Sequence, residues 1–190
     1  MSRTPSASAH EKVLKAALRL IGEHGIDGTS MDAIARLSGV SKATLYNHWK
    51  DKHALCLEVV SRLRTAPPEF RSGDPRRDLL SLLTYSAQAS RPGRTLKILP
   101  RIIGYAATNP RFGREFRAIT LGPTEAQLRR IVTEAISKGE LVPETDPEVA
   151  TSLLFGPIVH RKMMGGTVPP GLPEKVVDGF WRNWGATRSN

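Results

Sequence analysis

A run of hydrogen-bonding side chains without any acidic group lies between residues 41 and 48 of this 190-residue chain. Hydroxyl, imidazole and ammonium groups can bind phosphate oxygens, and an asparagine amide can pair with the edge of adenine. A carboxylate here would repel a DNA backbone, and the nearest one that follows is Asp51. The run consists of Ser41, Lys42, Thr44, Tyr46, Asn47 and His48. Their types therefore predict a surface that contacts DNA.

Two short helices must position this surface. The apolar spacing predicts one helix over about 30–38 and a second from 41 or 42 to about 49, with Gly39 ending the first and Ser41 capping the second. Thr29 and Asp32 stand three apart, close to a capping-box pattern. The inward side chains are Met31, Ile34, Ala35, Val40, Leu45 and Trp49. An ordinary helical hairpin would share this pattern, but the acid-free outward face favours a helix-turn-helix whose second helix enters the major groove.

The segment GVSKATLYNHWKDKHAL (residues 39–55) resembles the signature of the TetR family of bacterial transcriptional repressors. The preceding TSMDAIARLSG and the first helix, about 9–24, are similar too, so that the resemblance covers about residues 10–60. The chain departs from the family pattern at three positions: Trp49 stands where Phe is commoner, Asn47 where Tyr or another polar residue is frequent, and His53 where Glu is usual. Trp49 preserves the packing role, whereas Asn47 leaves the target sequence open.

The residues and the resemblance together assign roles at the DNA. Thr29 and Ser30, at a helix start, and Lys52, at the start of the fourth helix, are expected to bind phosphate. Ser41 caps its helix and touches phosphate, and Lys42 adds charge. Thr44 is the candidate for a base edge or a thymine methyl group, and Asn47 for a base or a phosphate. The resemblance implies phosphate contacts for Tyr46 and His48. The alternatives are partial core packing for Tyr46 and a solvated surface histidine for His48.

Composition and charge agree with a nucleic-acid partner. Lys and Arg total 28 against 18 Asp and Glu, giving a net charge of +10 and a sequence pI near 10.3. Such an excess favours polyanions, with DNA first and an anionic membrane surface second. The single cysteine, Cys56, excludes an internal disulfide. No apolar run is long enough for a membrane span. The start, MSRTPSASA, lacks the apolar core of a signal peptide, so we expect a cytoplasmic, nucleoid-associated protein.

The turn residues divide the remainder into further helices and predict an all-α fold. The fourth helix starts at Asp51 and ends before Pro67-Pro68, which open a linker. Later helices are expected over about 75–90, 94–107 with a kink or break at Pro100, 110–138 with an interruption near Gly122-Pro123, 147–164 and 173–186. We expect a flexible tail (1–9), a three-helix DNA-binding domain with its connecting helix (10–65) and a helical C-terminal domain for effector binding and dimerisation (66–190).

The segment LVPETDPEVATSLLFGPIVHRKMMGG (residues 141–166) resembles a C-terminal segment common in the TetR family. The resemblance implies a homodimer through residues 147–164 and 173–186, which would form a four-helix bundle. Apolar side chains on much of the circumference of 147–164 agree, although a core position within one subunit would also explain them. The resemblance also implies a small-molecule effector. Apolar and aromatic candidates for its pocket are Tyr85, Leu99, Ile103, Tyr105, Phe116 and Phe155, any of which can instead be core.

Enzymatic and metal-binding functions find no support. The acidic residues form no pair that suggests acid and base catalysis, and no nucleophile motif or phosphate-binding loop is present. His53 and Cys56 share a helical face, but two ligands are too few for a metal site. We therefore expect no catalytic residues, no cofactor and no metal.

The expected function is a repressor that a small molecule releases from a pseudo-palindromic operator in double-stranded DNA. A DNA-binding activator or architectural protein without an effector is the alternative, and an effector-binding module with a vestigial helix-turn-helix is a third possibility.

Overall fold

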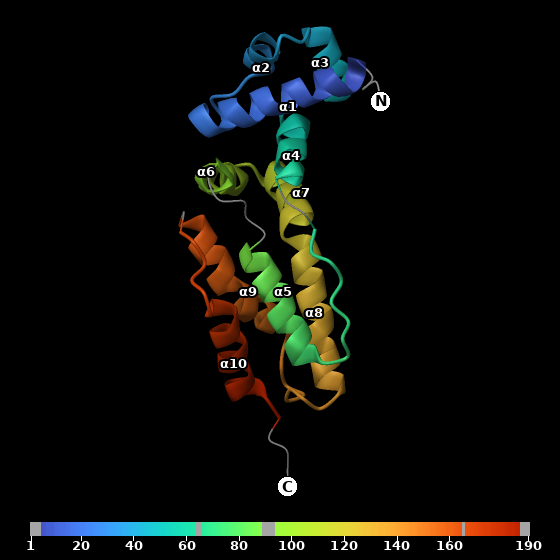
Figure 1. Cartoon of the computed structure of the whole chain (residues 1–190), viewed down its shortest axis with the longest axis vertical. Helices are drawn as coiled ribbons and strands as arrows, with labels where there is room; N and C mark the ends of the chain where they lie inside the picture. The colour runs from blue at the N-terminus through green and yellow to red at the C-terminus, as the bar shows by residue number, and fades with distance from the viewer. Residues whose placement is uncertain (1–4, 64–65, 89–93, 165, 187–190) are drawn as a thin grey trace. The chain divides into compact units, whose positions relative to one another are not determined.

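The computed structural model describes residues 5–63, 66–88, 94–164 and 166–186. All its named elements are helices, as the sequence predicts, and a single β-bridge joins Leu141 to Gly185. No helix of these ranges is long and apolar enough to cross a membrane. In chain order (Figure 1) the helices are α1 (Pro5–His24), α2 (Met31–Ser38), α3 (Lys42–His48), α4 (Lys52–Arg62), α5 (Pro75–Gln88), α6 (Arg94–Thr108), α7 (Pro110–Thr120), α8 (Gly122–Ser137), α9 (Pro147–Met163) and α10 (Leu172–Trp184).

The helix boundaries follow the predictions closely, with three differences. α1 begins at Pro5, so that residues 5–9, predicted as tail, are helical, while residues 1–4 lie outside the described part. α4 ends at Arg62, before it reaches the Pro67-Pro68 pair that was expected to limit it. α6 continues through Pro100 as one helix. The predicted interruption near Gly122-Pro123 is present, because α7 ends at Thr120 and α8 begins at Gly122.

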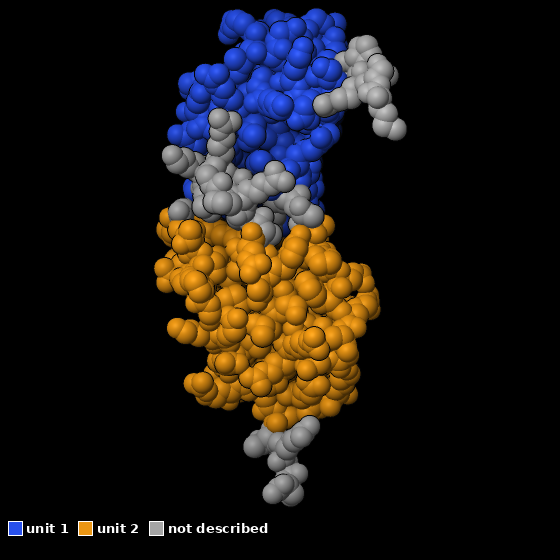
Figure 2. Space-filling view, viewed as in Figure 1, with its two compact units in different colours: residues 1–64, 92–120 blue, residues 65–91, 121–190 orange. Residues whose placement is uncertain are grey.

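The chain packs as two units (Figure 2): unit 1 contains residues 1–64 and 92–120, and unit 2 contains residues 65–91 and 121–190. Unit 1 therefore includes α6 and α7, which the predicted ranges assigned to the C-terminal domain. These two helices contribute Ile98, Ile102, Phe112 and Phe116 to the apolar core that also holds α1 and α4. The packing division thus differs from the predicted division at residue 66, and the functional assignment of the domains remains a prediction.

The inward face of the helix-turn-helix lies in the core of unit 1. Met31, Ile34, Ala35, Leu45 and Trp49 are buried, and Val40 is half-buried against the same cluster. The predicted bracing set is therefore confirmed. Because its five buried members come from α2, α3 and the residue after α3, the burial of their apolar surface fixes α3 relative to α1 and α2.

Side-chain caps start three of the helices in unit 1. Ser30, Ser41 and Asp51 each accept a hydrogen bond from the backbone N–H three residues further on, at 3.1, 3.2 and 2.8 Å. Gly39 takes φ 68°, the left-handed conformation that a residue without Cβ adopts readily, and so ends α2. The expected capping pair of Thr29 and Asp32 is wrong: Ser30 is the cap, and the hydroxyl of Thr29 donates elsewhere.

The described residues of unit 2 contain four helices. α8 and α10 each pack against both α5 and α9. Their shared core is aliphatic, with Phe155 and Phe180 as its aromatic members, and its largest contributors are Leu79, Leu82, Leu83, Leu128, Ile131, Val132, Leu154 and Ile158. α9 is therefore buried along one side within its own unit.

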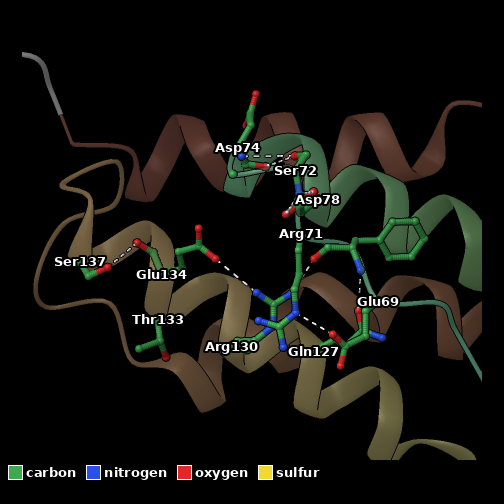
Figure 3. Close-up of polar contacts among 12 residues, drawn as sticks. Glu69, Arg71, Ser72, Asp74, Asp78, Gln127, Arg130, Thr133, Glu134 and Ser137 are labelled. Carbon is green, nitrogen blue, oxygen red and sulfur yellow. Dashed lines mark hydrogen bonds and ion pairs between the residues drawn. The ribbon is translucent and has the colours of Figure 1, made fainter.

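Residues 66–74, which precede α5 and are called the connector below, are hydrogen-bonded to side chains of α8 (Figure 3). Gln127 donates from Nε2 to the carbonyl of Pro68 at 3.1 Å and accepts the backbone N–H of Phe70 at 3.3 Å. Arg130 donates to the carbonyl of Phe70 at 2.6 Å. The predicted linker is therefore an extended stretch with defined partners.

The start of α5 is fixed by two carboxylates. Asp74 accepts the N–H of Arg77 at 3.0 Å and so caps the first turn of the helix. The buried carboxylate of Asp78 accepts the N–H of Ser72 with both oxygens at 3.0 Å. A buried carboxylate needs such donors to offset its lost hydration, so this pair anchors the connector where it enters α5.

Candidate nucleic-acid interface

The outward face of α3 is exposed and free of acidic groups. Lys42, Tyr46, Asn47 and His48 are exposed, and 52% of Tyr46 is accessible although the residue is large and aromatic. About half of the Tyr46 side chain is thus covered by the protein, which is compatible with the alternative of partial core packing, and the other half is open to a partner. These exposed polar side chains, on a helix anchored by buried Leu45, are accessible to bases and phosphates.

Thr44 is tied to the start of its own helix. Its hydroxyl lies 2.9 Å from that of Ser41, which also accepts the N–H of Thr44. One of the two hydroxyls therefore donates to the other. The half-buried side chain of Thr44 can still present its methyl group and the free lone pairs of its oxygen to a groove.

Lys42 is paired within the protein. Its Nζ lies 2.7 Å from Oδ2 of Asp32 on α2, and both side chains are more than half exposed. Such an exposed pair contributes little to stability. It does hold the ammonium group beside the helix pair and partly neutralises it.

Two predicted phosphate ligands, Thr29 and Lys52, make hydrogen bonds within the protein. Thr29 is buried and donates to the carbonyl of Gly25 at 2.6 Å, which leaves its hydroxyl no access to a phosphate in this conformation. Lys52 donates to the carbonyl of Ile26 at 2.8 Å. Both bonds fasten the turn between α1 and α2. Ser30 is exposed at the N-terminus of α2, where the sequence placed it.

A polar cluster that the sequence did not predict lies behind the end of α3. The indole Nε1 of buried Trp49 donates to Oε2 of Glu58 at 2.8 Å, and Nε2 of His10 lies 2.7 Å from Oε1 of the same carboxylate. The rings of His10 and Trp49 pack with centroids 4.6 Å apart. One signal was available: a tryptophan at an inward position brings an N–H that needs an acceptor when buried.

Burial raises the pKa of Glu58, but hydrogen bonds from His10 and Trp49 outweigh that effect and hold the pKa below its usual value. The carboxylate is therefore charged at neutral pH. It also lies 3.4 Å from Arg62 on its own helix.

The positive charge of the protein is concentrated in the unit that contains α3. Unit 1 carries 16 Lys and Arg against 7 Asp and Glu, a net +9, whereas unit 2 carries 12 against 11, a net +1. A polyanion is therefore attracted to unit 1 far more than to unit 2.

The predicted pocket residues do not form one group. Leu99, Ile103, Tyr105 and Phe116 belong to the core of unit 1, where Tyr105 and Phe116 are buried. Phe155 is buried in unit 2, and Tyr85 of the same unit donates to the carbonyl of Ala66 at 3.2 Å. Within unit 1, the hydroxyl of Tyr105 lies 2.5 Å from Nε2 of His53 on α4.

The predicted dimer helix α9 is apolar on two sides. Ala150, Leu154, Phe155 and Ile158 face the core of unit 2, while Val149, Leu153 and Met164, the residue after the helix, stay exposed. The internal-core explanation accounts for the first set only. Among the described residues, no three possible metal ligands gather.

Two models of known protein families match the chain. The model described as "Bacterial regulatory proteins, tetR family" matches residues 13–59, which include α2 and α3. The model described as "Tetracyclin repressor-like, C-terminal domain" matches residues 71–180.

Individual proteins are similar over most of their length. The HTH-type transcriptional regulator YdeS of Bacillus subtilis is 30% identical over 166 residues, which cover 86% of this chain and 83% of YdeS. The DNA-binding transcriptional repressor TetR of Mycobacteroides abscessus is 25% identical over 171 residues, covering 87% of this chain and 88% of that protein. The solved structure of a TetR-family regulator from Mesorhizobium loti covers 97% of this chain and 100% of its own, with a TM-score of 0.61 and 24% identity, and so shares the fold.

Proposed function

This chain belongs to the TetR family of bacterial regulatory proteins, and we propose that it represses transcription by placing α3 in the major groove of operator DNA. Membership makes it a DNA-binding transcriptional regulator, a class that is not an enzyme class. The observation that carries the proposal is the exposed, acid-free face of α3 on a buried apolar brace. The repressing role is supported by the similarity to the repressor of Mycobacteroides abscessus. Because the partner is the chromosome, we expect the protein at the nucleoid, in the cytoplasm.

We assign the contacts by the reach and chemistry of each side chain. Tyr46 and His48 are placed to bind phosphates, and Asn47 to bind a base edge or a phosphate. Thr44 presents its methyl group toward thymine. Lys52 keeps its bond to Ile26 and has further N–H groups for a phosphate.

At the edges of this surface, Ser30 and Ser41 can bind phosphate beside the helix starts that they cap. Lys42 supplies charge once it exchanges Asp32 for a phosphate. Thr29 braces the turn before α2 and is not a DNA ligand.

We propose that the repressor is a homodimer through α9 and α10, so that its operator is pseudo-palindromic. Exposed positions Val149, Leu153, Gly156, His160 and Met164 recur at steps of three and four residues, which is one helical stripe. A Cβ at Gly156 would meet nothing within 4 Å in its own unit, so this helix-interior glycine is not required by the subunit's own packing. A glycine in such a stripe permits close approach of a second helix.

We propose that a small apolar effector releases the DNA. An effector needs only different affinity for two conformers, and couplings of about 1–3 kcal/mol are typical. Of the candidate pocket residues, Tyr105 has the most direct route to the DNA-binding helices because it is hydrogen-bonded to His53 on α4. A ligand that displaced the Tyr105 side chain would break that bond.

The test is selection of duplex DNA from a random library, followed by binding measurements on the selected duplex. We expect Lys42→Ala and Tyr46→Ala to weaken binding by roughly five- to tenfold, as loss of single backbone contacts does. Arg77→Ala, at an exposed arginine on α5 in unit 2, should bind like the unmodified protein. Affinity should fall steeply with salt. Unchanged binding in both α3 variants would show that another surface holds the DNA.

A further inference from the structure

We propose that Glu58 is a positioning residue for DNA binding: its carboxylate accepts the indole N–H of Trp49 and thereby fixes the C-terminal end of α3. The inference rests on the proposed insertion of α3 in the groove. It goes further because Glu58 itself lies on α4, carries a negative charge and needs no contact with DNA.

The contact acts on the residue that directly follows α3. Trp49 is the C-cap of α3, and its backbone N–H donates to the carbonyl of Leu45 at 2.9 Å. His48 comes immediately before it, and Tyr46 and Asn47 belong to the same last turn. A side-chain bond that holds Trp49 in place therefore sets where these three groups point.

The indole creates the need for an acceptor. Trp49 is 4% exposed, so its N–H cannot rely on water. Oε2 of Glu58, at 2.8 Å, satisfies it. A phenylalanine would fill the same apolar site without any donor, so the carboxylate and the tryptophan act as a matched pair.

The same carboxylate joins three helices of the DNA-binding region. Oε1 of Glu58 lies 2.7 Å from Nε2 of His10 on α1, and the imidazole of His10 packs against both the indole of Trp49 and the ring of His48. The side chain of His48, a proposed phosphate ligand, thus contacts a ring that Glu58 orients. α1, the end of α3 and α4 meet at this one acid.

Charge and position predict opposite results, which makes the proposal testable. A carboxylate in unit 1 repels DNA, so simple electrostatics predicts that its removal strengthens binding. If Glu58 positions α3, its removal weakens binding although the protein becomes more positive. Glu23, on the exposed side of α1 and paired with Arg19, is a matched acid without a link to α3.

The experiment is a double-mutant cycle with Trp49→Phe, Glu58→Leu and the combined variant, measured on one selected duplex with each protein shown to be folded by circular dichroism. We expect Glu58→Leu to weaken binding roughly tenfold, about 1.4 kcal/mol. In the Trp49→Phe background the same change should have a much smaller effect, because the buried indole donor is absent and the other groups that lose a partner, His10 and Arg62, are partly exposed. Glu58→Gln, whose amide oxygen can accept the indole N–H, should restore affinity, and Glu23→Leu should bind equally or more tightly.

Equal or tighter binding by Glu58→Leu, an equal loss in both backgrounds, or a failure of Glu58→Gln to rescue would overturn the proposal. If Glu58→Leu alone does not fold, the affinity ratio between Trp49→Phe and the combined variant decides, and a ratio far from one contradicts the inference. Lys42→Ala separates the two proposals. If it weakens binding while Glu58→Leu does not, only the role of Glu58 fails, and if neither matters, the placement of α3 on DNA fails.

Discussion

The ammonium group of Lys42 lies 2.7 Å from the carboxylate of Asp32, so a cation on the proposed recognition helix is held by an anion on the helix that braces it. Each charge is well exposed, and neither is fixed by further burial. Exposed pairs of this kind exchange partners easily. In the free protein Asp32 lies beside Lys42, and on DNA we expect it to compete with phosphate for the same N–H groups.

Asp32→Asn should strengthen binding to any duplex by about two- to fivefold at low salt, because it removes the competing charge. The gain should shrink as salt rises, since exposed charges are screened. Fluorescence anisotropy titrations over a series of salt concentrations measure both effects. Weaker binding by Asp32→Asn would mean that orientation of Lys42 matters more than its neutralisation.

Leu153→Arg should weaken self-association by at least about tenfold, because it places a charge in the apolar stripe of α9. Leu153 is 45% exposed, so the change should leave the folding of the subunit intact. Sedimentation equilibrium reports the association constant. Ile119→Arg, at a comparably exposed apolar residue of α7, is the control and should associate normally. Identical behaviour of the two variants would exclude α9 from the interface.

Cys56 should be inert toward alkylating reagents in the folded protein. Burial raises its pKa to about 12, so at neutral pH the reactive thiolate is almost absent and the sulfur is also inaccessible. Mass spectrometry after iodoacetamide treatment should show no adduct under native conditions and complete modification in denaturant. Modification of the native protein would reveal local opening of α4.

Glu58 should make stability depend on acid pH. Its folded-state pKa lies below the ordinary 4.5, so its stabilising contribution is present above that value and is lost as pH falls through the lower folded pKa. Thermal midpoints recorded from about pH 6 down to about pH 3 should therefore fall less steeply for Glu58→Gln than for the unmodified protein. Glu144→Gln, at an exposed acid in unit 2, should change the slope less.

Gln127→Leu should loosen the connector. It removes bonds to the backbone of Pro68 and Phe70, and one such loss is worth about 1 kcal/mol, or about fivefold in the population of the open form. Trypsin cleavage after the exposed Arg71 should accelerate accordingly. Gln88→Leu, at the exposed end of α5, is the matched control. Equal cleavage rates would show that the other contacts, among them those of Arg130 and Asp78, hold the segment without Gln127.

Local signals predicted most of the fold. Ser41 caps α3 and Gly39 ends α2 because cap and turn chemistry depends on a few neighbouring residues. The burial of Ile34 and Leu45 followed from helical spacing alone. The exposed face of α3 followed from the same spacing.

Contacts between distant residues were beyond such reasoning. Phe112 and Phe116 are as apolar as any core residue of unit 2, and nothing in their spacing says that they pack on α4. Glu58 is nine residues from Trp49, on the next helix, so only the fold brings them together. Thr29 was predicted to bind phosphate from its place at a helix start, whereas its hydroxyl donates a hydrogen bond to the carbonyl of Gly25.

Unit 1 is discontinuous in the sequence, since residues 92–120 complete it only after residues 65–91 have entered unit 2. A ribosome therefore releases the whole helix-turn-helix well before α7 exists to pack against the apolar side of α4. A chimaeric regulator that borrows only residues 1–64 would inherit that uncovered apolar surface. A graft of the DNA-binding region onto another C-terminal domain should therefore include residues 92–120. DNA specificity would then be exchanged together with α6 and α7.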